Sequence, residues 1–266
     1  MTALWAALFA GFVAILATLA VEKLGGVLGG VVASIPTTVV PGVLGFFYAG
    51  AGFEQAVLAI PYGMFVNAVF LLTWRVLPTR LPFVGFQARL LSMILMSLLI
   101  WFCCAGVSVW IQHQYSSLHM SAIVVVVQAL FGIWACWNNP PAPKGTNPVG
   151  MSILAMRGLL AGTAIGCAIL MSHLGALAGM ASVFPAIFLT TMVSVWMAQG
   201  EAVPAGAVGP MMLGSTSVSL FSVLSILLLG LYGPIIGCLL SWGISVILVS
   251  VPAAIWLRHL SKSKEE

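Results

Sequence analysis

The chain has no aspartate, and charged residues make up only 5% of its 266 residues. A soluble domain carries about a quarter of its residues as charged side chains, so this chain lacks the polar groups needed to cover a water-exposed surface. The missing aspartate also excludes a Ser-His-Asp hydrolase triad. Hydrophobic residues make up 62% of the chain, and the sequence therefore predicts an integral membrane protein.

Other signatures of chemistry are also missing. The sequence has no phosphate-binding loop, no haem-attachment motif and no spaced set of metal ligands. Neither a disulfide framework nor a zinc site is indicated, because no CxxC pair occurs and every cysteine lies in an apolar segment: Cys103, Cys104, Cys136, Cys167 and Cys238. We expect no enzymatic activity, cofactor or metal. The net charge of +4 is interpreted as a topology signal, so nucleic acid is not an expected partner.

The apolar residues fall into long segments separated by short connections. About 20 apolar residues cross the hydrocarbon layer as a helix, and nine segments satisfy this length: 3–21, 26–48, 54–77, 86–112, 118–138, 150–172, 175–198, 204–228 and 232–257. The first lacks the basic start of a cleaved signal, so we interpret it as a retained span. The sequence therefore predicts an all-α, polytopic membrane protein.

The positive charges indicate how the protein is oriented. With nine spans, every basic residue lies on the same side of the membrane: Lys23, Arg75, Arg80, Arg89, Lys144, Arg157, Arg258, Lys262 and Lys264. Cytoplasmic loops carry the excess of Lys and Arg. We therefore expect an outside N-terminus and a cytoplasmic C-terminus, in a bacterial inner membrane or a plasma membrane, with lipid as partner.

A motif occurs twice at one offset. A glycine-rich segment ends at Pro36 and again at Pro185, and each is followed by a second proline, Pro61 or Pro210. Both pairs are 149 residues apart. Since an odd number of spans separates the copies, we predict an inverted repeat, as in many transporters. The expected organisation is a four-helix unit, a linking helix with a Pro-rich loop, a second four-helix unit and a tail: 1–112, 113–149, 150–257 and 258–266.

The two repeated prolines predict a site at the membrane centre. Pro36 and Pro185 each lie about ten residues into a span, which is about 15 Å, near the midplane. A proline removes a backbone donor and leaves carbonyls that lipid cannot satisfy. We predict that the following residues form a substrate site: Ser34, Pro36, Thr37, Thr38, Asn67, Ser182, Pro185, Thr190, Ser215 and Thr216. Alternatively, each hydroxyl bonds only to the carbonyl one turn back.

Two further groups of residues have less specific interpretations. Glu54 and Glu201 begin equivalent spans and are candidates for gating or coupling, although a helix N-terminus stabilises a carboxylate for purely structural reasons. Three histidines on the outer side could bind a transition metal or sense pH, or could be incidental interfacial residues: His113, His119 and His173.

Each unit resembles the GlpM-like family of small bacterial inner-membrane proteins. The matching residues are Phe184-Pro185 in the second unit and Tyr62-Gly63-Met64 in the first. The first unit departs from the pattern with Ile35-Pro36. The resemblance implies that the chain is a fused, inverted pair of a module that otherwise assembles as a dimer, and it implies no activity.

The function that these patterns favour is secondary transport or facilitated permeation of a small neutral or zwitterionic solute. One unit would rock against the other around the midplane site. Two alternatives remain: a membrane subunit or assembly scaffold whose prolines serve packing alone, or a channel lined by hydroxyls. Transport requires the polar residues of both units to converge on one cavity, and a homo-oligomer is possible in either case.

Overall fold

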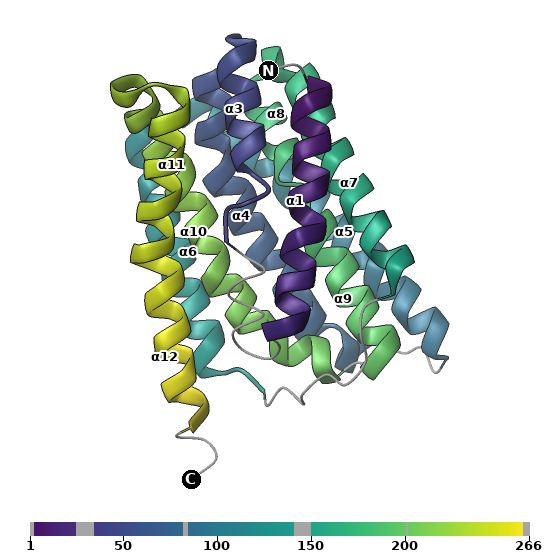
Figure 1. The fold of residues 1–266 in the computed structure, drawn as a ribbon. Coiled ribbons are helices and arrows are strands. Elements are labelled where there is room, and N and C mark those ends of the chain that lie inside the picture. Colours follow the sequence, from purple (N-terminus) through teal and green to yellow (C-terminus); the bar gives the residue numbers. More distant parts are fainter. Residues whose placement is uncertain (1–2, 25–34, 82–84, 141–149, 201, 263–266) are drawn as a thin grey trace.

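The computed structural model describes residues 3–24, 35–81, 85–140, 150–200 and 202–262, and two predicted site residues, Ser34 and Glu201, lie outside these ranges. Within them, every regular element is a helix. The long helices pack side by side as a bundle, with the N-terminus at one end and the C-terminus at the other (Figure 1).

The elements follow one another with short connections. In chain order the α-helices are α1 (Ala3–Leu24), α3 (Val40–Ala49), α4 (Phe53–Val76), α5 (Phe86–Tyr115), α6 (Leu118–Trp137), α7 (Met151–Leu170), α8 (Ala176–Ser182), α9 (Ala186–Gln199), α10 (Ala202–Tyr232), α11 (Pro234–Ser245) and α12 (Val251–Lys262). Short 3₁₀ turns are η1 (Pro78–Arg80) and η2 (Ser172–Leu174), and η3 (Val246–Ser250) is a π-helical turn.

Seven helical segments of the described chain are long and apolar enough to cross a membrane, counting α8 with α9 and α11 through α12 as one segment each. The remaining apolar helices are shorter within the described residues, at Ala3–Leu16 and Val40–Ala49. The predicted all-α membrane protein is confirmed at this level.

Two prolines interrupt the chain in the middle of the bundle. Helix α8 ends at Ser182, and α9 begins only after Pro185, which is the N-cap of α9. Pro36 likewise lies in a turn over residues 35–39 that precedes α3. Both segments are therefore broken rather than merely kinked, because a proline supplies no backbone donor and clashes with the preceding turn.

The other repeated pair, Pro61 and Pro210, stays inside the helices α4 and α10. Pro210 has no N–H for the carbonyl of Gly206, and the side-chain amide of Asn139 donates to that carbonyl at 2.5 Å. Near Pro61, the Ser121 hydroxyl donates to the carbonyl of Leu58 at 3.0 Å. Polar groups at the two ends of α6 thus satisfy carbonyls near both kinks.

Helix α6 lies against both α4 and α10. Midway along it, the buried Gln128 donates from Nε2 to Ser215 Oγ at 3.0 Å and accepts from Ser219 Oγ at 2.5 Å. A fully satisfied buried amide fixes the register of two helices, because sliding either helix would leave several polar atoms without partners. The linking segment is therefore held to α10 by specific hydrogen bonds.

The π-helical turn η3 has a local cause in the sequence. Pro252 cannot donate to Leu248, and the N–H of Val251 bonds to Val246, five residues back. This arrangement inserts one residue into the helical pattern, as π-turns do. Along α11, Gly237, Ser241 and Ser245 are buried at a spacing of four, and the next buried polar residue is Ser250, five further on.

Candidate functional site

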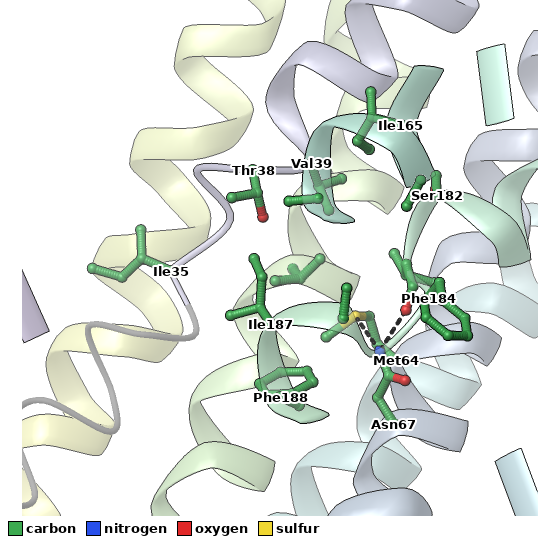
Figure 2. Close-up of a pocket in the computed structure, with 15 residues that line it drawn as sticks. Ile35, Thr38, Val39, Met64, Asn67, Ile165, Ser182, Phe184, Ile187 and Phe188 are labelled. Carbon is green, nitrogen blue, oxygen red and sulfur yellow. Dashed lines mark hydrogen bonds between the residues drawn. The ribbon is translucent and has the colours of Figure 1, made fainter. Parts of the chain in front are cut away.

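A small cavity lies where the broken segments meet, with a volume of about 60 Å³. Figure 2 shows its lining residues, which come from the turn before α3, from α4 and α7, and from the break between α8 and α9. Three predicted site residues line it: Thr38, Asn67 and Ser182. The structure therefore brings polar residues of both predicted units to one cavity.

Asn67 on α4 is the polar centre of this cavity, and its side chain is 1% exposed. Its Nδ2 donates to the carbonyl of Val183 at 2.8 Å (Figure 2). That carbonyl lies in the break before Pro185. Asn67 Oδ1 accepts from Trp101 Nε1 on α5 at 2.7 Å. The amide therefore joins three helical segments and satisfies a carbonyl that lipid could not.

Close packing makes this bond possible. A Cβ built on Gly63 would lie 2.3 Å from Val183 Cγ2, so only glycine lets α4 approach the break this closely. On the other side of the break, Phe184 meets the Trp101 ring edge to face, with ring centroids 5.2 Å apart. Edge-to-face pairs of this kind are favourable. The break is thus held from two sides, by α4 and by α5.

Several predicted hydroxyls bond to the backbone of their own segment. Ser182 donates to Gly179, Thr190 to Ala186 and Ser215 to Met212, at 2.7, 2.8 and 2.8 Å. Thr37 donates to Ile35 at 3.4 Å, beside the buried Pro36. These groups follow the local pattern common for hydroxyls in apolar helices. Of this set, only Ser182 also lines the cavity.

Two other predicted residues lie away from the cavity lining. Thr216 is 1% exposed, and its hydroxyl has no hydrogen-bond partner. Glu54 is exposed in the first turn of α4, where the helix N-terminus favours a carboxylate. Its position accords with the structural interpretation and gives no direct contact to the cavity.

Sequence reasoning missed the role of two residues. Trp101 had no assigned place, because its partner Asn67 is 34 residues away in the chain. Arg157 was counted among the charges that flank a cytoplasmic loop, but its side chain is 4% exposed within the bundle. Its Nε donates to Thr190 Oγ1 at 3.1 Å and its Nη2 to Ser194 Oγ at 3.2 Å. Its position six residues inside an apolar helix was the available signal, since arginines within membrane helices usually face the protein interior.

The cavity has the chemistry of a binding site. Both α3 and α9 begin beside it, and neither has a side-chain cap at its N-terminus. Helix N-termini carry free N–H groups and partial positive charge. Together with the Asn67 amide and the Thr38 hydroxyl they offer hydrogen bonds to a small polar solute. Among the described residues, no three His, Cys, Asp or Glu side chains gather as a metal site.

Comparisons with models of protein families, with curated proteins and with solved structures found no match for this chain. The resemblance of each unit to the GlpM-like family therefore stays a prediction. What the chain does has to be argued from its own geometry.

Proposed function

We propose that the protein is a secondary transporter or facilitator of a small polar solute, built as an inverted repeat around the central cavity. One observation carries the proposal. Three pairs of residues at the repeat offset of 149 line the same small space: Ile35 with Phe184, Thr38 with Ile187, and Val39 with Phe188. Equivalent residues of two repeats meet in one space only near the axis that relates the repeats.

Helix packing supports the same symmetry. An inverted repeat of four spans each, joined by α6, makes α1 equivalent to α7 and α4 equivalent to α10. The structure packs α1 against α7, and α4 against α10. It also packs α4 against α5, and α10 against α11, which are equivalent neighbours within the two units. These contacts favour a twofold arrangement over a chance recurrence of prolines.

The size of the cavity suits an occluded state. Open ligand pockets have volumes of about 300–1,000 Å³, whereas this cavity measures about 60 Å³. In the proposed cycle, the breaks at Pro36 and Pro185 act as hinges, and one unit rocks against the other to open the cavity to each side in turn. The bond from Asn67 to Val183 holds one break closed in the present conformation.

Access of water to the cavity tests transport without knowledge of the solute. Starting from a variant in which the native cysteines are replaced by alanine, single cysteines are introduced at Thr38 and at its equivalent Ile187. Thiols react as thiolates and need water. A water-soluble, membrane-impermeant thiol reagent is expected to label both positions, at least about tenfold faster than a cysteine at the lipid-facing Val126.

The competing functions give other results. A scaffold with a dry centre would label Thr38Cys as slowly as the Val126Cys control, and that outcome would overturn the transporter. A channel would show labelling together with ion conductance across a planar bilayer. A transporter should show labelling from both sides of the membrane without such conductance.

The same chemistry tests the proposed orientation, with basic residues on the cytoplasmic side. Thr79 and His173 are both exposed, in the turns η1 and η2. In intact cells, an impermeant reagent is expected to label a cysteine at His173 and to leave a cysteine at Thr79 unmodified until the cells are lysed. The reverse pattern would place the N-terminus in the cytoplasm.

A further inference from the structure

Two buried hydroxyls in the second unit have no hydrogen-bond partner. Thr216 on α10 is 1% exposed and Ser250 in η3 is 3% exposed, and neither hydroxyl oxygen is bonded. The other buried serines of α10 and α11 all donate to a carbonyl or a side chain: Ser215, Ser217, Ser219, Ser222, Ser225, Ser241 and Ser245. A buried polar group without a partner is unfavourable, and such groups in native structures call for an explanation.

Helix register places these two hydroxyls at the same height. A tight turn at Gly233 makes α11 antiparallel to α10, and Gly237 comes close to Leu228 and Leu229. Ser250 lies 13 residues beyond Gly237, and Thr216 lies 12 to 13 residues before that contact point. Each helix rises about 1.5 Å per residue. The π-turn supplies the extra residue that keeps Ser250 on the buried face, and η3 contacts α10.

The first unit shows what this pair of positions can do. At the repeat offset of 149, Thr216 corresponds to Asn67, and Ser250 corresponds to Trp101. In the first unit these two side chains bond to each other at 2.7 Å, and Asn67 continues the chain of bonds to Val183. The equivalent positions in the second unit therefore face each other within a polar network whose remaining partners are missing.

The surrounding chemistry selects the kind of ligand. Residues 203–257 contain no charged residue and no histidine, so α10, α11 and η3 offer only neutral oxygen groups here. Hydroxyl oxygens bind hard cations, and broken membrane helices use such neutral oxygens to hold Na⁺. Without a carboxylate to balance a second charge, a divalent ion would be held poorly.

We propose that Thr216 and Ser250 contribute two oxygen ligands to a monovalent-cation site in the second unit. The role of that cation as the coupling ion rests on the proposed transport function. Its binding does not, because the two oxygens would hold the ion in a scaffold as well. The asymmetry between the units then has a purpose: the first unit closes its network with Asn67 and Trp101, and the second unit leaves it open for the ion.

Thermal unfolding of the purified protein tests the site with simple salts. The unfolding midpoint is measured in NaCl, LiCl, KCl or choline chloride at constant ionic strength. At a hundredfold excess over its Kd, the bound cation is expected to raise the midpoint by roughly 5 °C relative to choline. The variants Thr216→Val and Ser250→Ala should lose the shift. Ser225→Ala, which removes a buried hydroxyl bonded to Phe221 on the same helix, should keep it.

Two results would overturn the proposal: no saturable shift with any of the three alkali cations, or a shift that persists in both variants. If Thr216→Val does not fold, Ser250→Ala alone decides. Failure of this site is distinguishable from failure of the transport proposal, because cysteine labelling at Thr38 and Ile187 reports the central cavity without any cation.

Discussion

Replacing Asn67 with leucine is expected to lower the free energy of unfolding by about 2–4 kcal/mol, among the largest effects of any single side chain in this protein. Leucine has nearly the same shape but no amide. The Val183 carbonyl and the Trp101 N–H would both lose their partner while staying buried. A buried group left without a partner costs about 1–3 kcal/mol. The midpoint of thermal unfolding in detergent measures the loss.

A variant at the other end of the bond separates the two contributions. Trp101→Phe removes the indole N–H and keeps most of the ring that packs on Phe184. It should cost less than Asn67→Leu, because only the Asn67 Oδ1 acceptor is left unpaired. The double variant should cost less than the sum, since both substitutions break the same bond. Additive losses, or an unchanged midpoint for Asn67→Leu, would show that the network does not hold the break in place.

The sequence predicted the helical membrane architecture well because length and hydropathy decide it. A helix must bury about 20 apolar residues to cross the bilayer, and that requirement is visible in the chain without tertiary information. The prolines were less decisive. Pro36 and Pro185 lie in true breaks, whereas Pro61 and Pro210 remain inside helices. The difference depends on neighbours: Asn139 reaches Gly206 from another part of the chain, and local sequence cannot show that contact.

The candidate site was predictable only in part for the same reason. Asn67 stood out because a carboxamide deep in an apolar segment needs an interior partner. Which hydroxyls line the cavity could not be predicted. Most of them bond to the preceding turn, and the face that each presents depends on how the helices are rotated. Trp101 and Arg157 bond to residues 34 and 33 positions away, so neither partner lies on the same helix.

Substituting Gly179 with alanine is expected to destabilise the protein by about 1–3 kcal/mol or more, the usual cost of adding a group to a filled interior. Gly179 lies on α8, where a Cβ would fall 2.0 Å from the carbonyl oxygen of Ala56 and 2.6 Å from Ala59 Cβ on α4. The obstacle is largely backbone, so it cannot rotate away. Small residues at such crossings let membrane helices come close together. Thermal unfolding in detergent measures the effect.

Gly106→Ala is the matched control, because a Cβ at Gly106 on α5 would meet no atom within 4 Å. Alanine is the better helix former by up to about 1 kcal/mol, so this variant should be neutral or slightly stabilised. Equal midpoints for both variants would contradict the close crossing of α8 and α4.

The same crossing positions the break that follows α8. A Gly179→Ala variant that moves α8 away from α4 also pulls Val183 from Asn67, so its cost should overlap with that of Asn67→Leu. We therefore expect the combined variant to lose less stability than the two separate losses predict, by at least about 0.5 kcal/mol. Strict additivity would mean that helix packing and the Asn67 bond act independently, and that the break is held by the hydrogen bond alone.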